Sequence, residues 1–527
     1  MKRIYLIIIT VIILITSFGV HAQTDFEKYL QHRDSVYNDY VNKSTDGYKN
    51  FKDSIDNEFA QYRDSINKAF AQFLKQSWES HTLKENKLVI PVKPETPPVF
   101  DPNKQTPPVK IEPKSTPIKI YEEPQLPIDD FSNRINKELK EKLAEYYKTA
   151  SHKDQFDFYG GKINIFYDDM NFNILSINNQ TVSQAWKQLS QKNYLPVIDQ
   201  LAQYAHEYNL NDWGYMLLIK ELGNKLYNNN NKTTLFTWFV LANTGYVNVK
   251  AGHLNNKLYL LVPSSMDIYS TYYFTNDNYK LYVFDLDNIR NSVKGISYAE
   301  NSPKVSTYNN KFYNEKTKEF NFFQTEQLDF NKHTQAKQLG FMYNAKYTTF
   351  NLMYDAQAVD FYNDFPPCES EVYFTSKLSK SALESIKKQF KPMLEGKTKS
   401  QQVQFLLTFT QKAFNYQIDQ KQFGYERWLY PEEIIKYAYS DCEDRSSFFA
   451  QLVNYFTDLK VIGLIYTNHI ATAVCFGDKN IVGNYLEYKG YKYFICDPTF
   501  IGANIGNCMP KLARVSPKII DFASLTK

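Results

Sequence analysis

Residues 440–446 read Ser-Asp-Cys-Glu-Asp-Arg-Ser and precede an apolar stretch with helical spacing. Residues 468–474 read Asn-His-Ile-Ala-Thr-Ala-Val, and residues 495–499 read Ile-Cys-Asp-Pro-Thr. This order predicts Cys442 in the first turn of a helix, His469 at the start of one strand and Asp497 at the end of another. A helix packed on an antiparallel sheet can bring these three groups together, so we predict an α+β domain in the last quarter of the chain.

These three residue types suit catalysis by a thiol. The thiolate is the nucleophile, and a free cysteine has a pKa of about 8.5, so a site must lower it or supply a base. Ser440 and Asp441 predict a helix N-cap, which places Cys442 where unpaired N–H groups favour an anion. His469 would take the thiol proton, and Asp497 would orient the imidazole.

Two neighbouring observations qualify this prediction. His469 is the only histidine after His333, so a thiol in the C-terminal region has a single imidazole to work with. Glu443 and Asp444 oppose a low thiol pKa by their proximity, unless they bind Arg445 or cap nearby backbone. Taken singly, a cysteine at a helix start, a lone histidine and an Asp-Pro turn all have structural explanations.

Together the three stretches resemble the transglutaminase-like superfamily, whose papain-like fold occurs in transglutaminases, peptide N-glycanases and bacterial transglutaminase-like cysteine proteinases. The resemblance covers about residues 400–500 and includes the upstream run Trp-Leu-Tyr-Pro-Glu-Glu at 428–433. Three features depart from the family pattern. Ser440 replaces the usual glycine, no aromatic residue follows His469, and an additional hairpin is expected around residues 477–490.

The resemblance implies a nucleophile at Cys442, a general base and acid at His469 and an orienting carboxylate at Asp497. It also implies an oxyanion site made by the backbone N–H of Cys442 and a second donor. Trp428 is the candidate for that donor, and a core aromatic is the alternative. No cofactor or metal is expected, because the sequence has no zinc-spaced ligand pair, glycine-rich phosphate loop or dinucleotide fingerprint.

We therefore expect residues 396–527 to form an exported cysteine enzyme domain acting on peptide or amide bonds of a protein or peptide substrate. Hydrolysis is favoured over cross-linking because nothing marks an amine-acceptor site. The rival interpretation is a non-catalytic binding or assembly protein of the cell envelope that keeps the transglutaminase-like fold.

The N-terminal region predicts export and association. Residues 1–22 resemble a signal peptide, with Lys2 and Arg3 before a short apolar run, and an uncleaved anchor is the alternative. We expect a secreted or periplasmic protein, with association with the cell envelope as an open alternative. Residues 23–83 predict a long amphipathic helix or coiled coil. Its apolar stripe between residues 51 and 73 is expected to mediate self-association, packing back on the protein or envelope contact through residues 26–80.

The next region is rich in proline. Eleven of the chain's 21 prolines fall between Pro91 and Pro127, so residues 84–128 predict an extended linker, interpreted as a plain tether. Residues 129–395 form the expected middle region, helical at first and strand-rich after Gly245. Strands are predicted at residues 258–262, 272–274, 281–284, 320–323, 347–352 and 372–374. Residues 230–285 repeat the helix-then-strands outline of the C-terminal unit, and either a degenerate copy or a common α/β layout explains this.

Charge and cysteine content complete the prediction. The 61 basic and 57 acidic residues give a net charge of +4, which offers no argument for nucleic acid. Five cysteines are few for an exported chain of 527 residues. One bridge among Cys368, Cys475, Cys496 and Cys508 is one interpretation, and buried free thiols are the other.

Overall fold

The structure is a computed structural model that describes residues 60–88, 93–105, 107–114, 137–276, 279–295, 303–308, 312, 320–330, 333–477 and 480–522. The chain divides into two units, Met1–Phe70 and Ala71–Lys527. The signal peptide and the first part of the apolar stripe, residues 51–59, lie outside the described residues. Residues 60–74 are helical, so the predicted helix ends before residue 80. None of the described helices is long and apolar enough to span a membrane.

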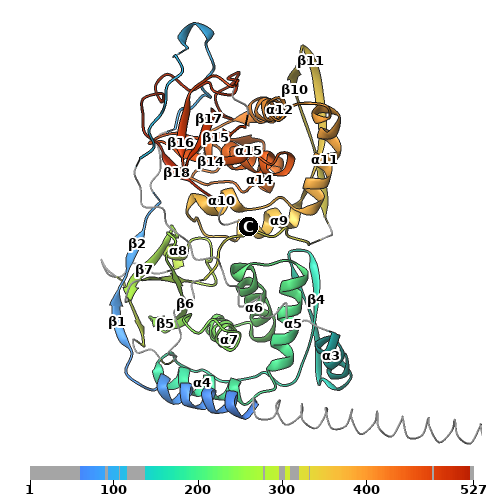
Figure 1. Ribbon diagram of the computed structural model, residues 1–527. Helices are drawn as coiled ribbons and strands as arrows, with labels where there is room; N and C mark the ends of the chain where they lie inside the picture. Colours follow the sequence, from blue (N-terminus) through green and yellow to red (C-terminus); the bar gives the residue numbers. More distant parts are fainter. Residues whose placement is uncertain are drawn as a thin grey trace, which may run out of the picture. The chain divides into compact units, whose positions relative to one another are not determined.

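The second unit is a mixture of helices and antiparallel sheets (Figure 1), which confirms the α+β class in its coarse form. Besides the helical residues 60–74, the described residues contain thirteen α-helices: α3 (Lys137–Thr149), α4 (Asn179–Ser190), α5 (Leu195–Glu207), α6 (Asp212–Tyr227), α7 (Asn230–Asn243), α8 (Ser292–Gly295), α9 (Ala356–Asn363), α10 (Ser370–Thr375), α11 (Lys380–Leu394), α12 (Lys399–Lys412), α13 (Asp419–Gln422), α14 (Pro431–Lys436) and α15 (Cys442–Phe456).

The middle region is built on a seven-stranded antiparallel sheet that curls into a nearly closed barrel. In spatial order its strands are β1 (Glu79–Thr82), β9 (Lys304–Thr307), β5 (Lys250–Leu254), β6 (Lys257–Ser264), β8 (Tyr279–Phe284), β7 (Thr271–Asn276) and β2 (Lys84–Asn86). Helix α7 packs against β5, β6, α4 and α6. Residues 233–242 of α7 are all buried, so the helix forms the centre of this region.

The C-terminal region is built on a curled five-stranded antiparallel sheet. Its strands are, in spatial order, β16 (Tyr485–Tyr488), β17 (Tyr491–Cys496), β15 (Ile470–Cys475), β14 (Lys460–Ile465) and β18 (Lys518–Ile520). Side chains alternate between its two faces. Val461 and Val474 face the core that contains α15, whereas Ile462 and Ala473 face a second core. The predicted helix on an antiparallel sheet is therefore present, and β16–β17 supplies the expected additional hairpin.

Three smaller pairs of strands connect or border these sheets. They are the antiparallel hairpins β3 (His152–Phe158) with β4 (Gly161–Tyr167) and β10 (Thr334–Tyr343) with β11 (Lys346–Asp355), and the parallel pair β12 (Asn415–Tyr416) with β13 (Tyr439–Ser440). The last pair matters for the site because β13 leads directly into the cap of α15.

The proline-rich segment is not a free tether. Its described part, residues 93–105 and 107–114, is called the strap below. Apart from the short 3-10 helix Pro102–Lys104, the strap has no helix or strand. Val99 and Lys110 form isolated parallel bridges with Ile501 and Tyr485, and Ile111 is buried in the second core. The strap therefore covers part of the C-terminal sheet.

Two of the predicted strands are wrong. Residues 372–374 belong to helix α10, whose six residues are all buried. Residues 320–323 are buried but form neither strand nor helix. In both places the aromatic and β-branched residues pack into a core without pairing in a sheet, because burial sets their preference as strongly as backbone geometry does.

The cysteine question is settled by the structure. All five cysteines are free, so the bridge considered among Cys368, Cys475, Cys496 and Cys508 is absent. The domain boundaries inferred from the sequence, and the degenerate copy at residues 230–285, stay predictions.

Candidate active site

Cys442 is the first residue of α15, and Asp441 is its N-cap. The neighbouring Asp444 supports this geometry, since its carboxylate accepts the backbone N–H of Asp441 at 3.1 Å and that of Leu429 at 2.8 Å. Arg445 donates to the carbonyl oxygens of Gln411 and Phe414. Thus Asp444 caps backbone, as one of the sequence alternatives proposed, and it does not pair with Arg445. These bonds fix the position of Cys442 in the first helical turn.

His469 and Asp497 meet at the edge of the sheet. His469 directly precedes β15, and Asp497 directly follows β17. His469 Nε2 lies 2.8 Å from Asp497 Oδ2, and both residues are buried. The other carboxylate oxygen, Oδ1, accepts the backbone N–H groups of Thr499 and Phe500 at 2.9 and 3.1 Å. The Asp-Pro-Thr turn therefore holds the carboxylate in one orientation, and the carboxylate orients the imidazole.

Cys442, His469 and Trp428 line one cavity of about 440 Å³. Asp267 and Tyr269, from the loop between β6 and β7, line it too. The middle region thus supplies part of the wall of a cavity whose predicted chemical groups all come from the C-terminal region. Trp428 is partly buried and its ring centroid lies 5.2 Å from that of Tyr373. This position is compatible with both sequence interpretations of Trp428, oxyanion donor and core aromatic.

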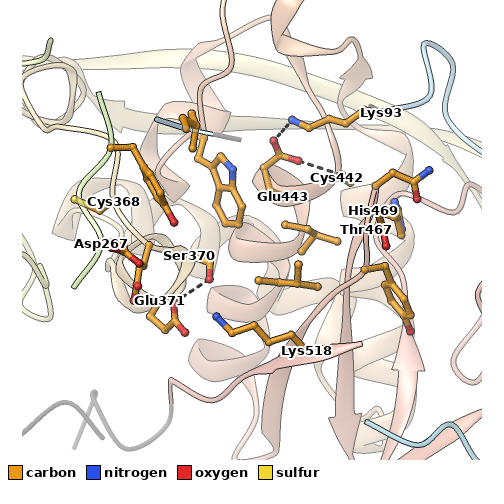
Figure 2. A pocket seen from close by; sticks show the side chains of 18 residues that line it. Lys93, Asp267, Cys368, Ser370, Glu371, Cys442, Glu443, Thr467, His469 and Lys518 are labelled. Atoms are coloured by element: carbon orange, nitrogen blue, oxygen red, sulfur yellow. Dashed lines mark hydrogen bonds and ion pairs between the residues drawn. The ribbon is translucent and has the colours of Figure 1, made fainter. Parts of the chain in front are cut away.

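The Cys442 thiol is bound to a carboxylate in this structure. Cys442 Sγ donates to Glu443 Oε2 at 3.0 Å (Figure 2). Among the described residues, Glu443 is the hydrogen-bond partner of the thiol. His469 lines the same cavity but is not hydrogen-bonded to the thiol. Burial, followed by repulsion from Glu443 and Asp441, raises the pKa of Cys442 well above its ordinary value. The thiol is therefore protonated at neutral pH, and the capped helix start does not by itself create a thiolate.

Glu443 is also bound by a lysine from the strap. Lys93 Nζ forms an ion pair with Glu443 Oε1, so the thiol and the ammonium hold opposite oxygens of one carboxylate (Figure 2). The same ammonium lies 3.0 Å from Asp441, 2.6 Å from Glu426 and 3.5 Å from Asp419. All five of these charged residues are buried. We call Lys93 with these four carboxylates the Lys93 cluster.

The Lys93 cluster has more carboxylates than positive charges, and the pKa values reflect this. Burial by itself would lower the pKa of Lys93, but attraction to Glu443, Asp441 and Asp419 outweighs burial and raises it. Burial would likewise raise the pKa of Glu443, and Lys93 overcomes this so that the pKa of Glu443 is lowered. Burial and repulsion from Glu443 raise the pKa of Glu426 to about 7 and that of Asp441 well above its ordinary range.

The carboxylates around Cys442 are also possible metal ligands. Three overlapping groups have ligand atoms close enough together to hold an ion: Asp441 with Cys442 and Glu443; Asp419 with Asp441 and Asp444; and Asp419 with Glu426 and Glu443. Lys93 Nζ already contacts the four carboxylates of its cluster. The donor set is therefore engaged by an ammonium group, and we assign no metal to it.

The sequence located three chemical groups and missed their surroundings. Cys442, His469 and Asp497 occupy the predicted helix start, strand start and strand end. Cys442 and His469 line one cavity, and Asp497 binds His469. Lys93 was missed because it is 350 residues from Glu443 in a segment interpreted as a tether. Only the excess of acids between residues 419 and 444 signalled that a cation was needed.

No protein-family model, curated protein or solved structure matches this chain. The resemblance to transglutaminase-like enzymes therefore depends on the motif residues alone.

Proposed function

We propose that the chain is a transglutaminase-like cysteine enzyme that cleaves peptide or other amide bonds through Cys442, His469 and Asp497. The observation that carries the proposal is the buried His469–Asp497 pair at the edge of the sheet, with His469 Nε2 2.8 Å from Asp497 Oδ2. The His469 imidazole lines the same cavity as Cys442. A carboxylate fixed by two backbone N–H groups and bound to a cavity-lining imidazole is the arrangement that a base needs in thiol catalysis.

The proposed reaction steps follow from which ring nitrogen of His469 is already hydrogen-bonded. Asp497 binds Nε2 of His469, which leaves Nδ1 to accept the Cys442 proton. The sulfur then attacks the substrate carbonyl carbon, and the carbonyl electron pair moves to oxygen. The backbone N–H of Cys442 lies in the first helical turn, where it has no intrahelical acceptor, and would stabilise the oxyanion. Collapse expels the amine, which takes the proton from His469, and water then releases the acyl group and restores the thiol.

The hydrogen bond from Cys442 to Glu443 and the raised pKa of Cys442 favour one of two forms of this mechanism. A preformed thiolate–imidazolium pair would need a lowered thiol pKa. Here His469 acts as a general base that removes the proton as the substrate binds, after the thiol turns away from Glu443. This also makes hydrolysis dependent on a correctly oriented imidazole, since the thiol has little reactivity of its own at neutral pH.

The experiment is acylation of the full-length protein by p-nitrophenyl acetate at pH 7.5, followed by mass spectrometry. We expect one acetyl group on Cys442. His469→Ala should slow its appearance by roughly 100-fold or more, and Cys442→Ala should abolish it. Cys368 is the matched control, because it is a buried free thiol lining the same cavity. Cys368→Ala should leave the rate unchanged. An acetyl group that forms equally fast without His469, or that forms on Cys368, contradicts the proposal.

A second experiment addresses the reaction class. Incubation with a mixture of peptides should generate new amino termini if the acyl-enzyme passes its acyl group to water. Peptides joined through lysine would indicate transfer to an amine instead. Loss of either product in Cys442→Ala assigns it to this site.

The alternative function is a non-catalytic binding or assembly protein of the envelope that retains the fold. One observation favours it: the Cys442 side chain is only 1% exposed and is held as a neutral thiol by Glu443. Under this alternative the cavity binds a ligand with the same affinity in the wild type and in His469→Ala, and no acetyl group accumulates on Cys442.

A further inference from the structure

The strap is attached along the C-terminal region by backbone bonds. The Phe100 N–H donates to the Ile501 carbonyl at 2.9 Å, and the Ile501 N–H donates to the Pro98 carbonyl at 2.8 Å. Farther along, the Ile111 N–H donates to the Tyr485 carbonyl at 2.7 Å. The Ile111 side chain is buried beneath the sheet. These contacts fix the direction of the strap over the C-terminal region.

Near its first described residues the strap reaches the carboxylate that binds the thiol. The Tyr416 hydroxyl donates to the Pro94 carbonyl at 2.8 Å, and Lys421 pairs with Glu95 at 2.9 Å. Between these anchors and the cavity, Lys93 enters the protein with 3% of its side chain exposed. A lysine is almost never buried to this extent without carboxylate partners, and here the partner Glu443 is also the partner of the Cys442 thiol.

The charged and titratable groups that face Cys442 come from four parts of the fold. Glu443 and Arg445 come from α15 and Asp441 from its cap, while Lys93 comes from the strap. Tyr416, in β12, also interacts with the thiol electrostatically, and His469 lines the same cavity. Two other cations are nearby. Lys518 lines the same cavity, and the Arg445 guanidinium donates to Ser440 Oγ and to the carbonyl oxygens of Gln411 and Phe414. Lys93 is thus the cation bound directly to the carboxylate that holds the thiol.

We propose that Lys93 is a positioning residue for Cys442: its ammonium holds the Glu443 carboxylate and balances its charge while Cys442 becomes a thiolate. This inference rests on the proposed function, because it assigns Lys93 a part in the same reaction. When the Cys442 proton passes to His469, the thiolate and the Glu443 carboxylate are left as neighbouring negative charges. Lys93 offsets their repulsion and keeps the carboxylate turned toward the ammonium.

The proline-rich segment is then part of the site and not a spacer. Its prolines limit the backbone to extended conformations, so the strap loses little conformational entropy when it docks. The bonds to Ile501 and Tyr485 fix it on the C-terminal region. The docked strap thus places the Lys93 ammonium group beside Glu443, and the Asp-Cys-Glu-Asp motif itself contains no cation.

The experiment measures alkylation of Cys442 by iodoacetamide as a function of pH in the full-length protein, with peptide mapping to identify the thiol. Lys93→Met removes the charge and keeps the length of the side chain. We expect the midpoint of the pH profile to rise by about one unit, which is about tenfold slower alkylation below the midpoint. Lys93→Arg should restore most of the rate. Lys104→Met is the matched control, since Lys104 belongs to the same strap and its side chain is 79% exposed.

The second variant separates charge balance from a structural role of the strap. In the Lys93→Met background, Glu443→Gln removes the uncompensated carboxylate and should return the rate to within about threefold of the wild type. Glu443→Gln alone should speed alkylation. A structural role predicts instead that the two substitutions each impair the site and that their effects add. If Lys93→Met fails to fold, the alkylation rate of Glu443→Gln alone still tests the inference.

An unchanged pH profile in Lys93→Met, or slower alkylation in Glu443→Gln, overturns the inference. Alkylation requires only the thiolate, whereas acetylation also tests the base. A Cys442 that responds to Lys93 but is not acetylated in a His469-dependent way would therefore contradict the proposed function and leave the Lys93–Glu443 coupling standing.

Discussion

Helices α7 and α15 occupy equivalent places in their two regions and differ most at their first turns. Each is central, buried almost throughout and packed against a neighbouring antiparallel sheet (Figure 1). Each begins at a short polar cap residue, Asn229 for α7 and Asp441 for α15. The resemblance in outline is the one that suggested a degenerate copy from the sequence.

The first turn of α7 is conventional. Asn229 accepts the backbone N–H of Lys232 at 3.0 Å, and Asn230 is exposed while Asn231 and Lys232 are partly exposed. Asn231 also accepts the Leu258 N–H of β6 and donates to the Asn256 carbonyl in the turn between β5 and β6. Here the polar groups face water or bind backbone, so the helix start stabilises the fold at little cost in desolvation.

The first turn of α15 is polar and buried. Cys442, Glu443, Asp444 and Arg445 are each at most 1% exposed. Burial of several charges is expensive unless each has a partner, and removal of one partner is more costly than the pair is favourable. Asp441 and Asp444 cap α15, whereas α7 forms without buried charged residues in its first turn. Under the proposed function, Glu443 and its partners set the charge around Cys442.

The largest expected effect on stability comes from Asp444. Asp444→Ala leaves the buried N–H groups of Leu429 and Asp441 without their acceptor, which should cost about 3 kcal/mol of unfolding free energy. Lys232 is the residue at the same distance from the cap in α7, and Lys232→Ala should change stability by at most about 0.5 kcal/mol. Urea unfolding followed by tryptophan fluorescence measures both. Equal losses would mean that the two helix starts do not differ in the way we infer.

The contrast also explains what the sequence could predict. The placement of Cys442, His469 and Asp497 follows from local signals: a cap, an alternating strand and an Asp-Pro-Thr turn. Each signal acts within a few residues, so the sequence contains it directly. Helix α7 lies in the part of the middle region, before Gly245, that was predicted to be helical.

Non-local contacts were not predictable in this way. Lys93 meets Glu443 across 350 residues, and neither residue's neighbours in the chain indicate the other. The loop between β6 and β7, which lines the cavity through Asp267 and Tyr269, carries no signal of its own either. The wrong strand at residues 372–374 has a related cause, because its Val-Tyr-Phe run is buried by neighbouring helices such as α15 and not by a sheet.

A smaller effect is expected at the cap of α7. Asn229→Ala removes the acceptor of the Lys232 N–H, which should lower stability by about 1 kcal/mol. The rate of Cys442 alkylation should stay the same, because α7 supplies none of the residues that line the cavity. The measurement is urea unfolding together with alkylation at pH 8. A changed alkylation rate would mean that the two regions are coupled more tightly than their separate cores indicate.

The smallest effect concerns how stability depends on pH, and it sharpens the comparison because the first turn of α7 contains no carboxylate. Glu426 has a pKa raised to about 7 by burial and by Glu443, against about 4.3 in an unfolded chain. The folded protein therefore binds a proton at Glu426 that the unfolded chain has released. Stability contributed by this proton is present below about pH 4.3 and is lost as the pH rises to about 7.

The melting temperature of the wild type should accordingly fall between pH 5 and pH 7.5, and Glu426→Gln should make this fall shallower. Glutamine is uncharged throughout, so the variant resembles the protonated wild type at every pH. Asp419, Asp441 and Asp444 also have raised pKa values, so part of the slope should persist. Glu95→Gln is the control: its partner Lys421 lowers the pKa of this exposed carboxylate, and its contribution to stability disappears only below the range tested. An equal change of slope in both variants would place the origin of the pH dependence outside the Lys93 cluster, and the first turn of α15 would then differ from that of α7 in burial but not in proton binding.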